Sequence, residues 1–137
     1  MSVVNYEIQF GPMMWACQVS IDEEMPLTEH EGKTITTKDA IQQMVEFWTG
    51  WESRLDSNEG DYTATFLKQL AKEIFRVACT NRVKVKTIVD EFEGKEGWAP
   101  MDGSYGITII SIDTFTFVEE DFSVYEFKKK EAADGKK

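Results

Sequence analysis

The sequence predicts an α+β protein, in which an antiparallel sheet from N- and C-terminal hairpins carries two to three inserted helices packed on one face. Alternating apolar residues near both ends of the chain predict the strands. Apolar residues spaced by three and four in the middle predict the helices. Because the strands are segregated from the helices, the pattern favours an antiparallel sheet over a parallel one.

Two alternating runs predict the N-terminal hairpin. The first run has its apolar residues at Val4, Tyr6, Ile8 and Phe10, and the second has them at Trp15, Cys17, Val19 and Ile21. Gly11 and Pro12 lie between the runs and predict the turn. Residues 22–32 are then expected to form an acidic loop, and residues 33–36 a short extension or strand.

The first helix is predicted from about Lys38 to about Leu55. Thr36 or Thr37 supplies its N-cap, and Asp39 lies in its first turn. Gly50 interrupts the pattern and marks either a kink or an early end. The apolar face of this helix comprises Ile41, Met44, Val45, Trp48, Trp51 and Leu55.

The second helix has the strongest helical pattern in the sequence and is predicted from Asp61 or Thr63 to Thr80. Its apolar residues are Phe66, Leu67, Leu70, Ala71, Ile74, Phe75 and Ala78. The next segment, residues 83–93, fits either a strand or a helix. Helical spacing accounts for more of its apolar residues, so we favour a short helix that ends at Gly94.

The C-terminal part is expected to begin with a long connector, residues 94–106. A strand is predicted from Ile107 to Phe117, with a bulge near Asp113 where the alternation slips. A second strand, Ser123–Phe127, is predicted to close the C-terminal hairpin. Residues 1–127 are thus expected to form one domain, and residues 128–137 a charged, flexible tail.

The composition limits the classes of function. The 137-residue chain has a net charge of −10, and residues 1–60 hold 11 acidic and three basic side chains. Binding to nucleic acid by overall charge alone is therefore disfavoured. No apolar run is long enough to span a membrane, and the first residues lack the pattern of a secretory signal, so we predict a cytoplasmic location. Cys17 and Cys79 are interpreted as buried thiols in a reducing compartment, with a single disulfide as the alternative.

The connector is the first candidate site, because loops of this length in compact domains are often functional. Its candidate binding residues are Trp98, Asp102, Ser104 and Tyr105. They would offer a stacking surface with polar groups, but the connector contains neither of the two common glycine-rich phosphate-binding motifs. In the alternative interpretation, Trp98 and Met101 fold back onto the sheet edge, and Asp102 and Gly103 make a tight turn.

A basic stripe is the second candidate site. Lys68, Lys72 and Arg76 follow one another at four-residue steps, so they lie on one face of the second helix. Arg82 and two lysines continue the stripe, and Glu73 is the single acid between residues 68 and 86. The stripe predicts contact with an anion or a nucleic acid. The alternative is a solvated helix face, or one that complements acidic residues of the same or a neighbouring subunit.

The sequence predicts no metal site and no cofactor. His30 is the single histidine, and its flanking glutamates lack the converging ligands that a metal needs. The abundant aromatic residues are expected mainly in the core. Phe47 falls off the main apolar stripe of its helix, so that edge is the expected exposed patch, of the kind that contacts proteins.

These observations define three hypotheses of function. The leading one is a small acidic non-enzymatic protein that acts by contact with another protein, or as a homodimer; one version is an acidic mimic of nucleic acid. The second is nucleic-acid or anion binding through the basic stripe. The third is a small enzyme that uses Asp102, Ser104, Tyr105 or Asp113 beside the connector.

Overall fold

The computed structural model describes residues 3–11, 14–28, 32–80, 84–113 and 123–126 of the chain. The main sheet is antiparallel, with its strands in the order β1-β2-β5, and a smaller sheet pairs β3 with β4. The strands are β1 (Val3–Phe10), β2 (Trp15–Asp22), β3 (Pro26–Thr28), β4 (Thr34–Thr36) and β5 (Ile107–Ile112). The helices in the described part are α1 (Thr37–Phe47), α2 (Trp51–Ser57), α3 (Tyr62–Thr80) and α4 (Val85–Phe92).

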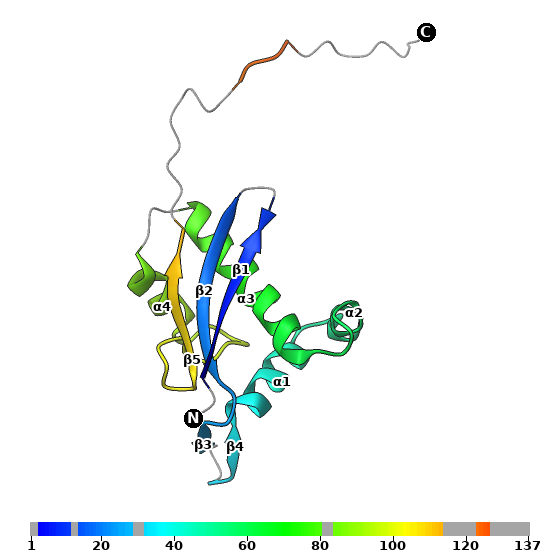
Figure 1. Ribbon diagram of the computed structural model, residues 1–137, viewed down its shortest axis with the longest axis vertical. Coiled ribbons are helices and arrows are strands. Elements are labelled where there is room, and N and C mark those ends of the chain that lie inside the picture. The colour runs from blue at the N-terminus through cyan, green and yellow to red at the C-terminus, as the bar shows by residue number, and fades with distance from the viewer. Residues whose placement is uncertain (1–2, 12–13, 29–31, 81–83, 114–122, 127–137) are drawn as a thin grey trace.

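The helices cover one face of the main sheet, which confirms the predicted α+β class. In Figure 1, α3 crosses behind the sheet, α4 lies beside β5, and the small sheet extends from the end opposite the β1–β2 turn. The central strand β2 alternates between buried and more accessible residues, and its buried side chains meet the apolar faces of the helices. The innermost core residues include Val19, Ile21, Ile41, Val45, Phe66, Leu70, Ile74, Ile88 and Phe92.

The helical region agrees with the sequence at three places and differs at one. Thr36 is the N-cap of α1 and forms a capping box with Asp39. The helix predicted over 38–55 is instead two helices, α1 and α2; the interruption lies where the sequence marked it, at Gly50, which adopts a left-handed φ of 83° just before Trp51. The helices predicted over 61–80 and 83–93 are present as α3 and α4.

The strands differ from the prediction in three respects. β3 was not predicted; it replaces part of the expected acidic loop. The register of β5 slips at Ile110, since Gln18 pairs with Ser111 and Val19 with Ile109, so the bulge lies three residues before the predicted position. Residues 123–126 form no strand, so the second strand of the predicted C-terminal hairpin is wrong over these residues. Residues 114–122 and 127–137, which include the rest of that hairpin and the tail, lie outside the described residues.

A close junction fixes the start of β5 against α1. The buried hydroxyl of Thr37 donates a hydrogen bond of 2.7 Å to the carbonyl oxygen of Tyr105, and the amide of Asp22 donates to the carbonyl of Gly106 at 2.8 Å. Gly106 has a φ of +82°, and a Cβ there would collide with Thr37 Oγ1 and lie 3.0 Å from the carbonyl oxygen of Asp22. The junction therefore needs a glycine both for its φ and for its space.

We expect Gly106→Ala to lower the free energy of unfolding by roughly 2–4 kcal/mol, because backbone strain and overpacking act together there. Gly94→Ala is the matched control. Gly94 also has a positive φ, of +73°, but a Cβ at that position would meet nothing within 4 Å. Its cost should be only about 1 kcal/mol. Urea unfolding followed by circular dichroism measures both values, and equal losses would contradict the packing role of Gly106.

Candidate functional site

An apolar groove of about 530 Å³ lies between β1 and α3, at one edge of the main sheet. The strands contribute Ile8, Gln9, Phe10 and Trp15, and α3 contributes Lys68, Ala71, Lys72 and Phe75. Phe10 remains 40% exposed beside it. The groove is thus an apolar surface with two ammonium groups on its α3 side.

The aromatic rings of the groove pack edge to face. The ring of Phe75 lies 4.9 Å from that of Phe10 and 5.1 Å from that of Trp15, with interplanar angles of 90° and 84°. Trp15 is only 2% exposed, and its Nε1 donates a hydrogen bond of 2.9 Å to the carbonyl oxygen of Asp113. This packing gives the groove a fixed aromatic floor, with Phe10 as its most accessible ring.

The backbone of β1 forms the open side of the groove. Among the described residues, β1 pairs with β2 alone, through the register Val3↔Asp22 to Phe10↔Trp15. In an antiparallel edge strand, alternate residues direct their N–H and C=O groups away from the sheet. The outer side of β1 therefore offers backbone donors and acceptors directly beside an apolar groove.

At the opposite edge of the sheet, the connector covers the first part of β5, Ile107–Ile109. The Gly103 amide donates to the carbonyl of Ile107 at 2.9 Å, and the Ile109 amide donates to the carbonyl of Met101 at 3.2 Å. Asp102 also forms an isolated bridge with Thr108. Met101 is fully buried. Met101, Asp102 and Gly103 thus follow the alternative interpretation of the connector, a turn that folds back onto the sheet edge, whereas Trp98 packs against Phe92 of α4.

The four candidate residues of the connector do not converge on one point. Asp102 Oδ1 accepts hydrogen bonds from the amide and the hydroxyl of Ser104, which lower the pKa of its carboxyl group. Trp98 packs against Phe92 in the core, with ring centroids 5.2 Å apart. Trp98 and Tyr105 line a separate cavity of about 410 Å³, which does not include Asp102 or Ser104.

Phe47 lines this second cavity as well, and it is half exposed, as its place off the helical stripe predicted. Gly97 allows this arrangement, because a Cβ there would lie 2.6–2.8 Å from the rings of Trp48 and Phe47. The cavity is bounded by α1, the small sheet and the connector.

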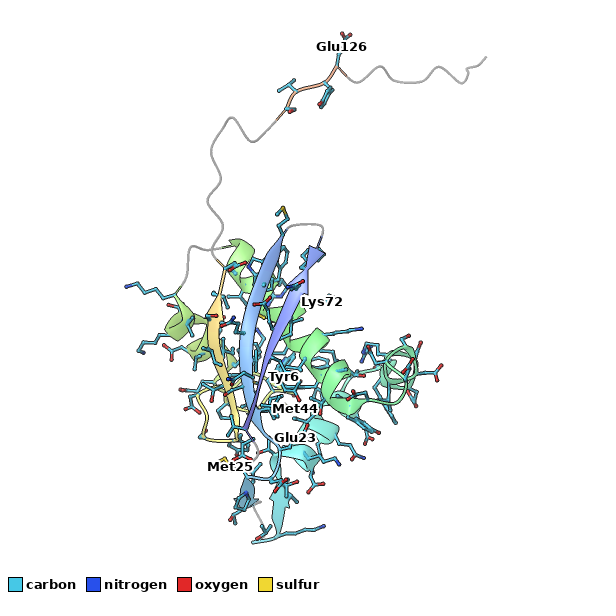
Figure 2. All side chains as sticks on the ribbon, in the orientation of Figure 1. Tyr6, Glu23, Met25, Met44, Lys72 and Glu126 are labelled. Carbon is cyan, nitrogen blue, oxygen red and sulfur yellow. The ribbon has the colours of Figure 1, made fainter. Side chains whose placement is uncertain are left out.

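The basic stripe exists on α3, but its members have different surroundings. Lys68 Nζ donates a hydrogen bond of 2.6 Å to Asn58 Oδ1. Arg76 forms a 2.6 Å ion pair with Glu73. Lys72 has no ion pair with any described residue, and it lines the groove; Figure 2 shows its side chain projecting outward from α3. Arg82 lies outside the described residues.

Glu73 neutralises much of the stripe's charge. Its carboxylate also forms a 2.7 Å ion pair with Lys95. Hydrogen bonding from Arg76, followed by the contact with Lys95, lowers the pKa of Glu73 to about 2 despite partial burial. The cations left at the groove are therefore Lys68 and Lys72.

Sequence reasoning missed Ile8, Phe10 and Phe75 as parts of a surface site, because it assigned all three to the core. One signal was available: Lys68, Lys72 and Phe75 are spaced by four and three, so they share one side of α3. This spacing places the aromatic ring of Phe75 on the same side of α3 as the two lysines, which could have indicated an apolar surface beside the stripe.

Other classes of site have less support in the described part of the chain. No described helix has the length and apolarity that crossing a membrane requires. No three acidic, histidine or cysteine side chains of the described residues gather to hold a metal ion, and His30 lies outside those residues. Cys17 is a free buried thiol, and burial, followed by the charge of Asp113, raises its pKa to about 12.

The fold and groove define a small α+β protein with an apolar groove beside the open edge of β1. Residues 29–124 match the family described as "Protein of unknown function (DUF2528)", and the chain belongs to this family. Two relatives are the Lambda prophage-derived protein ea10 of Escherichia coli O6:H1 (strain CFT073) and protein ea10 of Escherichia phage lambda. Each is 34% identical over 92 residues, which is 64% of this chain and 75% of the relative. No solved structure matches.

The family match covers only one side of the groove. It begins at residue 29, so it includes α3 with Lys68, Lys72 and Phe75 but not β1. It extends past β5 to residue 124.

We expect Glu73→Gln to lower the free energy of unfolding by about 1 kcal/mol at pH 7, because its two ion pairs are partly exposed to solvent. The pKa of this carboxylate is depressed on folding, so its contribution is complete above about pH 4.5 and is lost as the pH falls towards 2. Urea unfolding at several pH values measures this dependence. Glu96→Gln, at an exposed position, should change stability by less than about 0.5 kcal/mol. A Glu73→Gln effect that does not depend on pH would contradict the assignment.

Proposed function

We propose that this protein is a non-enzymatic binding module, which adds an extended segment of a partner protein to β1 and takes apolar side chains of that segment into the groove. The observation that carries the proposal is the juxtaposition of the open edge of β1 with the exposed ring of Phe10 and the apolar floor beneath it. Strand addition combines backbone hydrogen bonds, which give affinity, with side-chain pockets, which give specificity.

The groove suits a protein side chain better than a nucleic-acid base. Stacking of a base needs an accessible ring face, whereas Trp15 is almost fully buried and the rings pack edge to face. The overall charge of −10 repels a polyanion, and Glu73 compensates Arg76 within the stripe. These features support a protein partner over the nucleic-acid hypothesis.

A different protein also suits β1 better than a second copy of this chain. In a symmetric pairing of two β1 strands, Glu7 lies near the centre, so like charges would come close to each other. Each copy would in addition bring a net charge of −10 to the interface. The homodimer is therefore the weaker form of the proposal.

The enzyme hypothesis has the weakest support. The carboxylate of Asp102 is engaged by Ser104, and both lie apart from the cavity that Trp98 and Tyr105 line. General acid–base chemistry needs its groups around one reacting centre. A cytoplasmic location stays part of the proposal, supported by the free thiol of Cys17.

Selection from a displayed library of random peptides against the immobilised full chain tests the proposal. We expect enriched peptides to have apolar residues at alternate positions together with acidic ones. Phe10→Asp should weaken the binding of an enriched peptide at least tenfold, because it puts a charge at the mouth of the groove and removes the accessible ring.

Ile110→Asp is the matched control. Ile110 is 44% exposed, close to the value for Phe10, but it lies at the bulge of β5, away from the groove. This variant should bind the same peptide as the wild type does. If both variants lose binding equally, the proposal is wrong. It is also wrong if no peptide is enriched by either the wild type or a Val124→Ser/Tyr125→Ser chain. If the chain binds single-stranded DNA in the absence of peptide, and if Lys72→Glu abolishes that binding, the nucleic-acid hypothesis is favoured instead.

A further inference from the structure

The segment Ser123–Glu126 has apolar residues that are strongly exposed among the described residues. Val124 is 96% exposed and Tyr125 is 84% exposed, and the segment has no regular secondary structure. Its sequence nevertheless has a strand-like pattern, which predicted a strand at this position. A strand needs an edge to pair with, and among the described residues the outer edge of β1 is open along its whole length.

The side chains of this segment match the groove in kind. In an extended chain, residues two apart point to the same side, so Val124 and Glu126 would face α3 together. Val124 is an apolar side chain of a size that the groove admits, and Glu126 is an anion for Lys68 or Lys72. Glu119, Glu120 and Asp121 precede the segment, and no basic residue occurs between 113 and 127. The charges of groove and segment are therefore complementary.

The attachment point of the segment lies beside the groove. The amide of Asp113 donates to the carbonyl of Ala16, its carboxylate accepts from the Ala16 amide, and its carbonyl accepts from the indole of Trp15, each at 2.9 Å. Trp15 itself lines the groove. β5 and β1 are separated by one strand, which corresponds to about 10 Å. The ten residues from Asp113 to Ser123 span up to roughly 33–36 Å when extended. This length exceeds the separation between β5 and β1, so the segment can reach the groove.

We propose that Ser123–Glu126 docks on the β1–α3 groove of its own chain, pairing with the outer edge of β1 and placing Val124 in the groove and Glu126 against Lys72. Docking within one chain is favoured by the high effective concentration that a short tether gives. In Figure 2, Glu126 lies on the segment away from the sheet, and Lys72 marks the groove. The inference rests on the proposed function, because it makes this segment the internal ligand that a partner strand must displace.

Disulfide trapping in the full chain tests the docking. The variant Lys68→Cys/Val124→Cys is prepared with Cys79→Ser, and Cys17 is kept because its buried thiol has little tendency to ionise. Under mild oxidation we expect an intramolecular disulfide, seen as a faster monomer band on a non-reducing gel. Adding Glu126→Lys, or raising the salt to 1 M, should reduce its yield severalfold.

Gln18→Cys/Val124→Cys, in the same background, is the matched control. Gln18 is exposed on the other face of the sheet and pairs with Ser111, two residues before Asp113, so the tether can reach it as well as the groove. Random collision would give similar yields for the two pairs, whereas docking favours the Lys68 pair by at least fivefold. Lys72→Cys/Val124→Cys, at another exposed position that lines the groove, provides the second test if the Lys68 variant does not fold.

Equal yields for groove and control pairs would overturn the inference, and so would a disulfide that forms only between two chains. The two proposals fail separately. If peptides are selected by the groove but the disulfide does not form, the internal ligand is wrong and the binding function stands. If the disulfide forms but no peptide is selected even by a Val124→Ser/Tyr125→Ser chain, docking stands and the binding function is wrong.

Discussion

The hydrogen bonds between the connector and β5 are the constraint on which the other features depend. A three-stranded open sheet has two edges, and Gly103 and Met101 close one of them by bonding to Ile107 and Ile109. The junction of Gly106 with Thr37 fixes the connector in this place. Because the connector bonds to the first part of β5, β1 is the edge that the described residues leave open along its whole length. The contacts of the connector with β5, at one edge of the sheet, thus determine that the other edge, β1, is the surface available to a partner.

The position of α3 turns that open edge into a groove. The apolar face of α3 packs mainly against the centre of the sheet, so Phe75 at its border reaches Phe10 and Trp15 while β1 remains largely exposed. Glu73 binds Arg76 and Lys95, which leaves Lys68 and Lys72 as the cations beside the apolar surface. An apolar groove with two cations and a free strand edge selects for extended, apolar and acidic segments.

The sequence predicts those features that depend on local chemistry. The capping box at Thr36 and Asp39, the break at Gly50 and the alternation of β2 follow from residue type and spacing. It does not predict β3, because three residues that include Pro26 carry too little pattern. It also misplaces Phe10: alternation gives the side on which a residue lies, but not whether its strand is central or at an edge. The candidate site was predicted only in part, through Lys68 and Lys72, since the groove depends on strand order.

Backbone amide chemical-shift mapping of the full chain with an enriched acidic peptide tests the central claim most directly. If β1 and α3 form the docking surface, the largest shifts will fall in Val3–Phe10 and Lys68–Phe75, and the amides of Gly103 and Ile109 will not change. Shifts centred on the connector and the cavity around Phe47 and Tyr105, with β1 unaffected, would contradict the account.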